Sequence, residues 1–260
     1  MRLHKAIARV SITFVWTLLL LPLQVVLVAL GDAPHTEWVP RLYHAGLCRI
    51  LGISIKVVGA PVSHRPAVFV ANHSSWLDIL VLGSLVGGSF VAKAEVARWP
   101  GVGVLARLQR TEFVERTRRK ASTHVHQLQQ RLDSGARLMI FPEGTSTDGS
   151  YVLPFKSALF AAVERTSRSA KPVVQPVTVA YVRIDGHPAD QRTRPIVAWY
   201  GDMEFAPHIW GIFQLGDIGV DVTFHEPAPD ISRESRKALS AHCEGVVMAE
   251  HTRLIGGKSK

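Results

Sequence analysis

The sequence predicts an α/β fold, a β-sheet with helices on its faces, that follows an N-terminal membrane-associated helical segment. Beyond residue 52 the apolar pattern alternates between strand-like and helix-like stretches, which is typical of a sheet covered by helices. Before it lies an apolar run, residues 8–30, whose single charge is Arg9. With 260 residues, 47% of them hydrophobic, the chain suffices for one sizeable domain and is too apolar for disorder. We therefore expect N-terminal membrane anchor helices over 1–52 and one α/β domain over 53–260.

The N-terminal run admits three interpretations. Its length is close to the roughly 20 residues that cross a bilayer, so it suits a spanning anchor. Because Pro22 and Gln24 interrupt it, a membrane-embedded helix that does not fully cross fits as well. A cleaved signal peptide has a similar basic start but a shorter apolar core. Arg2, Lys5 and Arg9 precede the run and favour a cytoplasmic N-terminus.

The next stretch, residues 38–51, carries apolar residues at helical spacing and predicts an amphipathic helix. Its Arg41 and Arg49 suit anionic headgroups, but an ordinary core-facing helix explains the same pattern. Farther along, short apolar runs bounded by turn residues predict strands over 53–58, 67–71, 89–92, 112–115, 137–141, 173–182, 196–200 and 220–224. Longer stretches predict helices over 76–84, 117–134, 156–167 and 232–254, the last capped by Ser232.

The amino-acid composition limits the classes of binding partner that suit this chain. The chain has 30 Lys and Arg against 21 Asp and Glu, a formal net charge of +9, so it suits nucleic acid, an anionic membrane or phosphorylated substrates. The positive mean hydropathy of +0.14 favours the membrane over nucleic acid, and is too low for a polytopic transporter. Cys48 and Cys243 have no Cys or His at metal-ligand spacing, so we expect neither a disulfide framework nor a metal site.

The first candidate site is the segment from Asn72 to Asp78, where a buried strand ends and a helix begins. Chemical sites collect at the carboxyl ends of strands in α/β folds. The Asp78 carboxylate can accept a hydrogen bond from one nitrogen of His73, which leaves the other nitrogen free as a general base on a hydroxyl. The alternative is a surface histidine with Asp78 in the first turn of a helix.

Two further segments carry candidate chemistry. The turn from Phe141 to Ser146 follows a strand, and its Gly144 permits close backbone approach, so a phosphate fits there; an ordinary strand-ending turn is the alternative. The basic run 107–120 is mostly a solvated face, but Arg116 follows the strand 112–115 directly and suits a phosphate.

Together these segments resemble the glycerolipid acyltransferase family over about residues 55–180. The family's Asn-His-x4-Asp motif is matched by Asn72, His73 and Asp78, and its Phe-Pro-Glu-Gly-Thr motif by residues 141–145. The resemblance implies a mixed β-sheet flanked by helices, of the glycerol-3-phosphate acyltransferase-like type. It implies His73 and Asp78 as catalytic residues, no metal and no cofactor. The substrate-binding residues that it implies are Asn72, Phe113, Arg116, Phe141, Pro142, Glu143, Gly144, Thr145, Lys156 and Pro176.

By this resemblance, His73 deprotonates the free hydroxyl of a lysophospholipid, and the oxygen attacks the thioester of acyl-CoA or acyl carrier protein. No acyl-enzyme is needed, which agrees with the lack of a Gly-x-Ser-x-Gly elbow. The implied reaction converts 1-acyl-sn-glycerol 3-phosphate to phosphatidic acid in phospholipid biosynthesis. The family's usual Gly and Arg are replaced by Arg110 and Ser146, which leaves lyso-ornithine lipid or another lysolipid as the alternative acceptor.

The implied location is the bacterial inner membrane, with the active site facing the cytoplasm. Both lipid substrates reside in the bilayer, whereas the thioester donor arrives from the cytosol. We therefore expect residues 8–30 and the helix 38–51 to form a hairpin-like anchor among membrane phospholipids. A hydrolase or a membrane-tethered basic binding protein are the rival functions, and nucleic acid is not an expected partner.

Overall fold

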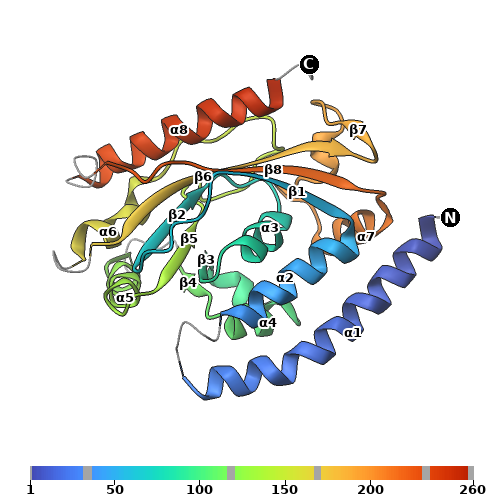
Figure 1. Cartoon of the computed structure of the whole chain (residues 1–260), viewed down its shortest axis with the longest axis horizontal. Helices are drawn as coiled ribbons and strands as arrows, with labels where there is room; N and C mark the ends of the chain where they lie inside the picture. Colours follow the sequence, from blue (N-terminus) through green and yellow to red (C-terminus); the bar gives the residue numbers. More distant parts are fainter. Residues whose placement is uncertain (1, 32–36, 116–120, 167–170, 230–234, 257–260) are drawn as a thin grey trace.

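The computed structural model describes residues 2–31, 37–115, 121–166, 171–229 and 235–256, and its centre is a twisted β-sheet (Figure 1). The strand order is β1-β8-β6-β2-β5-β3-β4, and β7 pairs with β6. Strand β6 is antiparallel to β8 and β7, and the other neighbours are parallel. The predicted mixed sheet is therefore confirmed. The strands are β1 Ile53–Val58, β2 Ala67–Ala71, β3 Ser89–Lys93, β4 Glu112–Val114, β5 Arg137–Ile140, β6 Val173–Ile184, β7 His187–Pro188 and β8 Ile218–Phe224.

Helices cover both faces of this sheet. Because strand side chains alternate, Phe69 of β2 joins one apolar cluster and its neighbours Val68 and Val70 join another. The first cluster takes side chains from α2, α3 and α7, and the second from α5, α6 and α8. The helices are α1 Arg2–Ala29, α2 Trp38–Leu51, α3 Leu77–Leu85, α4 Val102–Leu108, α5 Ala121–Asp133, α6 Ala161–Arg165, α7 Phe205–Gln214 and α8 Arg236–Gly256, with 3-10 turns η2 Ala94–Arg98, η4 Ser157–Phe160 and η6 Arg194–Ile196.

The N-terminal helix α1 continues through Pro22 and lies antiparallel to α2 (Figure 1). Its segment Leu3–Ala29 is long and apolar enough to cross a membrane. Trp16 Nε1 donates to the Tyr43 carbonyl, 3.2 Å away, and a Cβ on Gly46 would collide with the Trp16 ring, so glycine is required for this approach. The expected hairpin of two helices is present. Its insertion into the cytoplasmic leaflet of the membrane stays a prediction.

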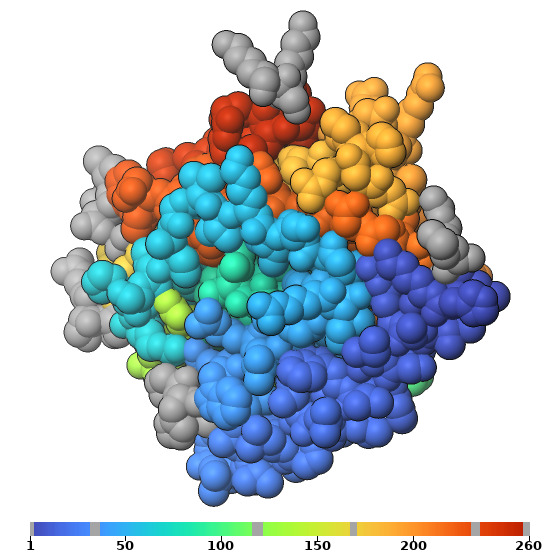
Figure 2. Space-filling view, turned by 45° about the vertical axis from the view of Figure 1, so that its right-hand side comes forward, coloured from blue at the N-terminus to red at the C-terminus, as the bar shows by residue number. Residues whose placement is uncertain are grey.

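One face of α1 is anchored to the domain and another is apolar and exposed. Arg9 is buried and donates to the carbonyls of Leu215, at 2.6 Å, and Gly216, at 3.0 Å. Figure 2 shows α1 in dark blue across the molecular surface, beside α2. Exposed large side chains on α1 include Ile12, Phe14, Val15, Leu18, Leu19, Val25 and Val26. Such a continuous apolar face on a helix that also packs on the domain suits a bilayer surface.

Helix α2 belongs to the domain core as well as to the predicted anchor. Leu47, Cys48 and Leu51 are buried in the same cluster as α3 and β8. One side of this helix therefore faces the core, as one interpretation of residues 38–51 predicts. Trp38 and Leu42 on the other side remain exposed. The division into 1–52 and 53–260 stays a prediction.

Three predicted elements differ from the structure. The strand expected at 196–200 is wrong: Val197 and Ala198 are buried residues of the loop that follows η6, where Val197 N donates to the Arg194 carbonyl. Residues 156–166 form η4 and α6 in place of one helix, and residue 167 lies outside the described part of the chain. The described part of helix α5 begins at Ala121, because the predicted residues 117–120 lie outside the described residues. The proposed cap Ser232 also lies outside them. Helices α4 and α7 were not predicted.

Candidate active site

The structure brings His73 and Asp78 together at the carboxyl end of β2. His73 Nδ1 lies 2.8 Å from Asp78 Oδ2, and Asp78 is fully buried in the first turn of α3. The His73 side chain remains about one-fifth exposed. A buried carboxylate on Nδ1 favours the tautomer that keeps its proton on Nδ1, which leaves Nε2 as the basic nitrogen. The pair is therefore arranged for proton abstraction from a substrate hydroxyl.

Asp78 accepts hydrogen bonds from four donors. Besides His73, its Oδ2 accepts from the backbone N–H groups of Ser74, at 2.8 Å, and Ser75, at 2.9 Å. Its Oδ1 accepts from the Tyr181 hydroxyl at 2.7 Å. Burial and the Asp78 carboxylate raise the pKa of Tyr181 well above its ordinary value, so this hydroxyl stays a donor. The sequence analysis missed Tyr181, which lies on β6 and reaches the site only because β6 pairs with β2.

Glu143 holds the loop that carries His73. Its Oε1 accepts from the His73 backbone N–H at 2.6 Å, and its Oε2 accepts from the Leu153 N–H at 2.6 Å. Glu143 is 1% exposed, and burial raises the pKa of its carboxyl to about 7 from an ordinary 4.5, against the opposing effect of the two hydrogen bonds. The side chain thus positions the loop that carries His73, a role different from the expected contact with substrate.

Two other motif residues also support the loop. The Asn72 amide bridges β2 to β6, because Nδ2 donates to the Val179 carbonyl at 2.8 Å and Oδ1 accepts from the Val179 N–H at 2.9 Å. The Phe141 ring stacks on His73 with centroids 4.2 Å apart. Both contacts fix the position of His73, and both amide atoms of Asn72 are used within the protein.

The turn after β5 has the shape expected of a headgroup site. Gly144 has φ +71°, a conformation that favours glycine, and a Cβ there would lie 2.8 Å from Lys156 Nζ. The Lys156 backbone N–H donates to the Pro142 carbonyl at 2.9 Å. Thr145 and Lys156 are exposed, so a hydroxyl and an ammonium group border this turn within the reach of a polar headgroup.

The remaining predicted site residues are not all in this cluster. Pro176 is buried within β6, where it pairs with Val70. Phe113 lies on β4 at the sheet edge, half-buried and paired with Ala92 of β3. Arg116 lies outside the described residues. Within the described part of the chain, no group of three or more His, Cys, Asp or Glu side chains is placed to hold a metal ion.

A large apolar cavity of about 560 Å³ is separated from His73 by the Phe141 ring. Its lining comes from α1, α2, α3, α4, α7 and β3. Phe90 lines the cavity and stacks on Phe141, with ring centroids 6.1 Å apart, and Phe141 in turn stacks on His73. Trp76, at the start of α3, also lines the cavity. The wall of the cavity is thus linked to His73 through stacked aromatic rings.

The buried carboxyl of Glu143 gives a pH-dependent prediction. Its pKa is raised by folding, so the folded state binds this proton more tightly, and the stability of the protein falls as pH rises between about 4.5 and 7. Glu143→Gln removes this titration. From pH 5 to 7.5 the unfolding free energy of the wild type should therefore fall relative to the variant by roughly 1–3 kcal/mol in urea titrations. The exposed Glu204→Gln serves as the control, and a difference that does not change with pH would refute the assignment.

Comparisons with known proteins agree with this geometry. A family model described as acyltransferase matches residues 54–180, which include every motif residue described above. The chain is 42% identical to the lyso-ornithine lipid O-acyltransferase of Brucella abortus (strain 2308) over 214 residues, 81% of this chain and 80% of that protein. It is 28% identical to the 1-acyl-sn-glycerol-3-phosphate acyltransferase of Neisseria meningitidis serogroup B over 207 residues, 78% of this chain and 77% of that protein.

A solved structure shares the fold. The crystal structure of the 1-acyl-sn-glycerophosphate acyltransferase from Thermotoga maritima matches with a TM-score of 0.70 and 22% identity, over all of both chains. The arrangement of the sheet and its covering helices is thus a known fold.

Proposed function

Because this chain belongs to the glycerolipid acyltransferase family and is an acyltransferase acting on lysolipids, we propose that its acceptor is lyso-ornithine lipid. The observation that carries the proposal is the similarity to a lyso-ornithine lipid O-acyltransferase at 42% identity, against 28% for a lysophosphatidate enzyme over a similar length. The alternative acceptor of the sequence analysis is therefore better supported than its first choice, 1-acyl-sn-glycerol 3-phosphate.

The position after the Phe-Pro-Glu-Gly-Thr motif agrees with this acceptor. Ser146 stands there in place of the family's usual Arg, and its hydroxyl donates to the Trp199 carbonyl at 2.5 Å. The Ser146 side chain thus holds the loop after η6 by this hydrogen bond, and it supplies no positive charge for a phosphate. An ornithine headgroup bears an amine and a carboxylate, and a single ammonium such as Lys156 is a sufficient partner for its carboxylate.

In the proposed mechanism, Nε2 of His73 takes the proton of the acceptor hydroxyl as its oxygen attacks the thioester carbonyl. Asp78 stabilises the imidazolium that forms, because its carboxylate stays hydrogen-bonded to Nδ1. The tetrahedral intermediate collapses with cleavage of the carbon–sulfur bond, and the imidazolium returns its proton to the departing thiolate. The products are an ester and a free thiol, with acyl-CoA or acyl carrier protein as the donor.

The apolar cavity explains how a fatty chain is held during this step. We assign it to the acyl chain, because its lining is largely apolar, includes residues of α1, α2 and α4, and includes Phe90, which stacks on the Phe141 ring that in turn stacks on His73. Helix α1 is long and apolar enough to cross a membrane, which supports a position of this cavity close to the bilayer in which the acceptor resides. We also propose attachment to the inner membrane with the site facing the cytoplasm, because the proposed thioester donor is cytosolic.

A cellular experiment tests the acceptor. The gene is expressed in a bacterium that accumulates lyso-ornithine lipid because its own acyltransferase has been deleted, and its lipids are analysed by mass spectrometry. We expect ornithine lipid to reappear with the wild-type chain and to stay absent with His73→Ala. Rescue of a strain lacking its lysophosphatidate acyltransferase, without formation of ornithine lipid, would overturn the proposal.

A further inference from the structure

A cluster of aromatic rings joins the apolar cavity to the turn 141–146 after β5, the headgroup turn. Trp99 packs against Trp199 with ring centroids 5.6 Å apart, and both pack against Phe205, at 4.9 Å and 5.4 Å. Trp76 lies 5.9 Å from Phe205, and these two rings also line the apolar cavity. The proposed proton transfer involves none of these rings.

The backbone of Trp199 contacts both motif segments of the active site. Its N–H donates to the Ser74 carbonyl at 2.8 Å, and its carbonyl accepts from the Ser146 hydroxyl at 2.5 Å. Ser74 directly follows the catalytic His73, and Ser146 ends the headgroup turn. The cluster therefore lies where the reacting hydroxyl and the headgroup of an acceptor lipid come together.

Two rings of the cluster are both fixed and accessible. Trp99 and Trp199 are half-buried, and Trp199 Nε1 donates to the Met203 carbonyl at 2.9 Å, which holds its ring in place. Trp76 Nε1 donates to His208 Nδ1 at 3.0 Å, and burial lowers the pKa of His208, so this imidazole is neutral near pH 7. Tryptophan is the aromatic side chain that attracts a cation most strongly.

The charges beside the rings favour a cation. Asp202 and Glu204 are exposed on the turn between Trp199 and α7, and the segment 199–205 contains no Lys or Arg. On the side of Trp99, η2 carries Glu95 and Arg98, which contribute opposite charges. A positively charged group at the rings is therefore attracted both by the indole faces and by nearby carboxylates.

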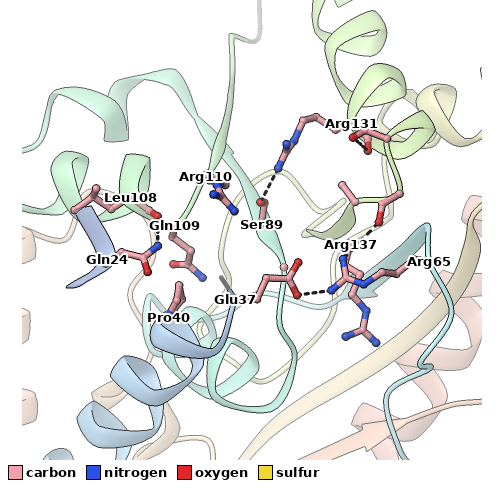
Figure 3. A pocket seen from close by; sticks show the side chains of 14 residues that line it. Gln24, Glu37, Pro40, Arg65, Ser89, Leu108, Gln109, Arg110, Arg131 and Arg137 are labelled. Carbon is pink, nitrogen blue, oxygen red and sulfur yellow. Dashed lines mark hydrogen bonds and ion pairs between the residues drawn. The ribbon is translucent and has the colours of Figure 1, made fainter. Parts of the chain in front are cut away.

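Clustered arginines lie at the other end of the sheet. Figure 3 shows a pocket of about 120 Å³ that is lined by Arg65, Arg110, Arg131 and Arg137. It adjoins the amino ends of β3 and β5, whereas His73 follows the carboxyl end of β2, which runs parallel to β5. Arg65 bonds Glu37 at 2.5 Å, and Arg131 bonds Glu112 at 3.0 Å. These guanidinium groups thus lie away from the headgroup turn.

We infer that the Trp99–Trp199 ring pair binds the ammonium group of the acceptor headgroup and so distinguishes an aminolipid from lysophosphatidate. The inference rests on lyso-ornithine lipid as the proposed acceptor and names the side chains that select it. The ammonium lies against the indole faces while the acceptor hydroxyl reaches His73. The negative face of an indole ring does not attract a phosphate, so lysophosphatidate gains nothing from the cluster.

The test compares three acceptors with purified protein and one acyl-CoA. They are lyso-ornithine lipid, the same lipid with its side-chain amine acetylated, and the same lipid with that amine trimethylated. Acetylation removes the charge, whereas trimethylation adds similar bulk and keeps it. We expect kcat/KM to fall at least about fivefold on acetylation and to stay within about threefold on trimethylation.

The outcomes separate this inference from the proposed function. Equal kcat/KM for the free and acetylated amines would overturn the inference and leave lyso-ornithine lipid as the acceptor. A trimethylated lipid as poor as the acetylated one would overturn it too, because bulk and not charge would then be sensed. A wild-type protein that acylates none of the three would overturn the proposed function together with the inference.

Two variants of Trp199 separate the ring from its hydrogen bond. Trp199→Phe and Trp199→Leu both lose the bond to Met203, but only the first keeps an aromatic face. The preference for the free over the acetylated amine should decrease from wild type to Trp199→Phe and approach about 1 in Trp199→Leu. Trp210→Leu, at a tryptophan of α7 that is 40% exposed, should keep the full preference. A Trp199→Leu protein that is slower with both acceptors by the same factor would show a structural or membrane-contact role and overturn the inference.

Discussion

Replacing His73 by alanine should lower the rate of acyl transfer by about 10²–10⁴-fold, the usual contribution of a general base. The side chain is partly exposed and its Nδ1 contacts Asp78, so its removal takes away the proton acceptor and leaves the buried core unchanged. The measurement is the release of free thiol from acyl-CoA in the presence of the lysolipid acceptor, with purified protein.

A matched control is available on the surface. His187 lies on β7 and is exposed, and His187→Ala should retain the wild-type rate. Equal rates for His73→Ala and wild type would show that another group accepts the proton. Thiol release that persists without the lipid acceptor would instead support the hydrolase interpretation.

Asp78→Asn should lower the rate of acyl transfer by on the order of 10³-fold in the same assay, with the protein still folded. The amide oxygen can keep the three hydrogen bonds now made to Oδ2, and the Tyr181 hydroxyl can turn to accept from the new amide group. The variant thus retains the packing and loses the negative charge that stabilises the imidazolium.

Tyr181→Phe is the companion variant. It leaves the carboxylate charged and removes one of its four hydrogen bonds, so the expected loss of rate is only about tenfold. A larger loss in Tyr181→Phe than in Asp78→Asn would contradict the electrostatic role assigned to Asp78 and would point to a direct role for the tyrosine.

The sequence was most informative where a motif coincides with the end of a strand. The short apolar run 67–71 and the polar segment after it located β2 and both members of the His73–Asp78 pair. The boundaries of β1 and α2 were also predicted to the residue, because glycines and polar residues delimit strong apolar patterns. Local patterns thus sufficed for the elements that carry the catalytic pair.

Long-range pairing was what the sequence did not reveal. Tyr181 is 103 residues from Asp78, and only the alignment of β6 with β2 brings the two together. The run 196–200 continues from η6 into a loop in which Val197 and Ala198 are buried, and burial alone does not distinguish a strand from a turn. Helix α7 contains Pro207 and Gly211, which conceal a helical pattern from sequence analysis.

The role of Glu143 also required the structure. A glutamate in a strand-ending turn suggests contact with substrate, and only its burial and its hydrogen bond to the His73 backbone show a supporting role.

The most direct test of the account is a competition between acceptors. Equal concentrations of lyso-ornithine lipid and lysophosphatidate are mixed with purified protein and one labelled acyl-CoA, and the ratio of the two products gives the ratio of kcat/KM values. The account predicts ornithine lipid as the main product, and neither product with His73→Ala. A preponderance of phosphatidic acid, or ester formation that survives His73→Ala, would contradict it.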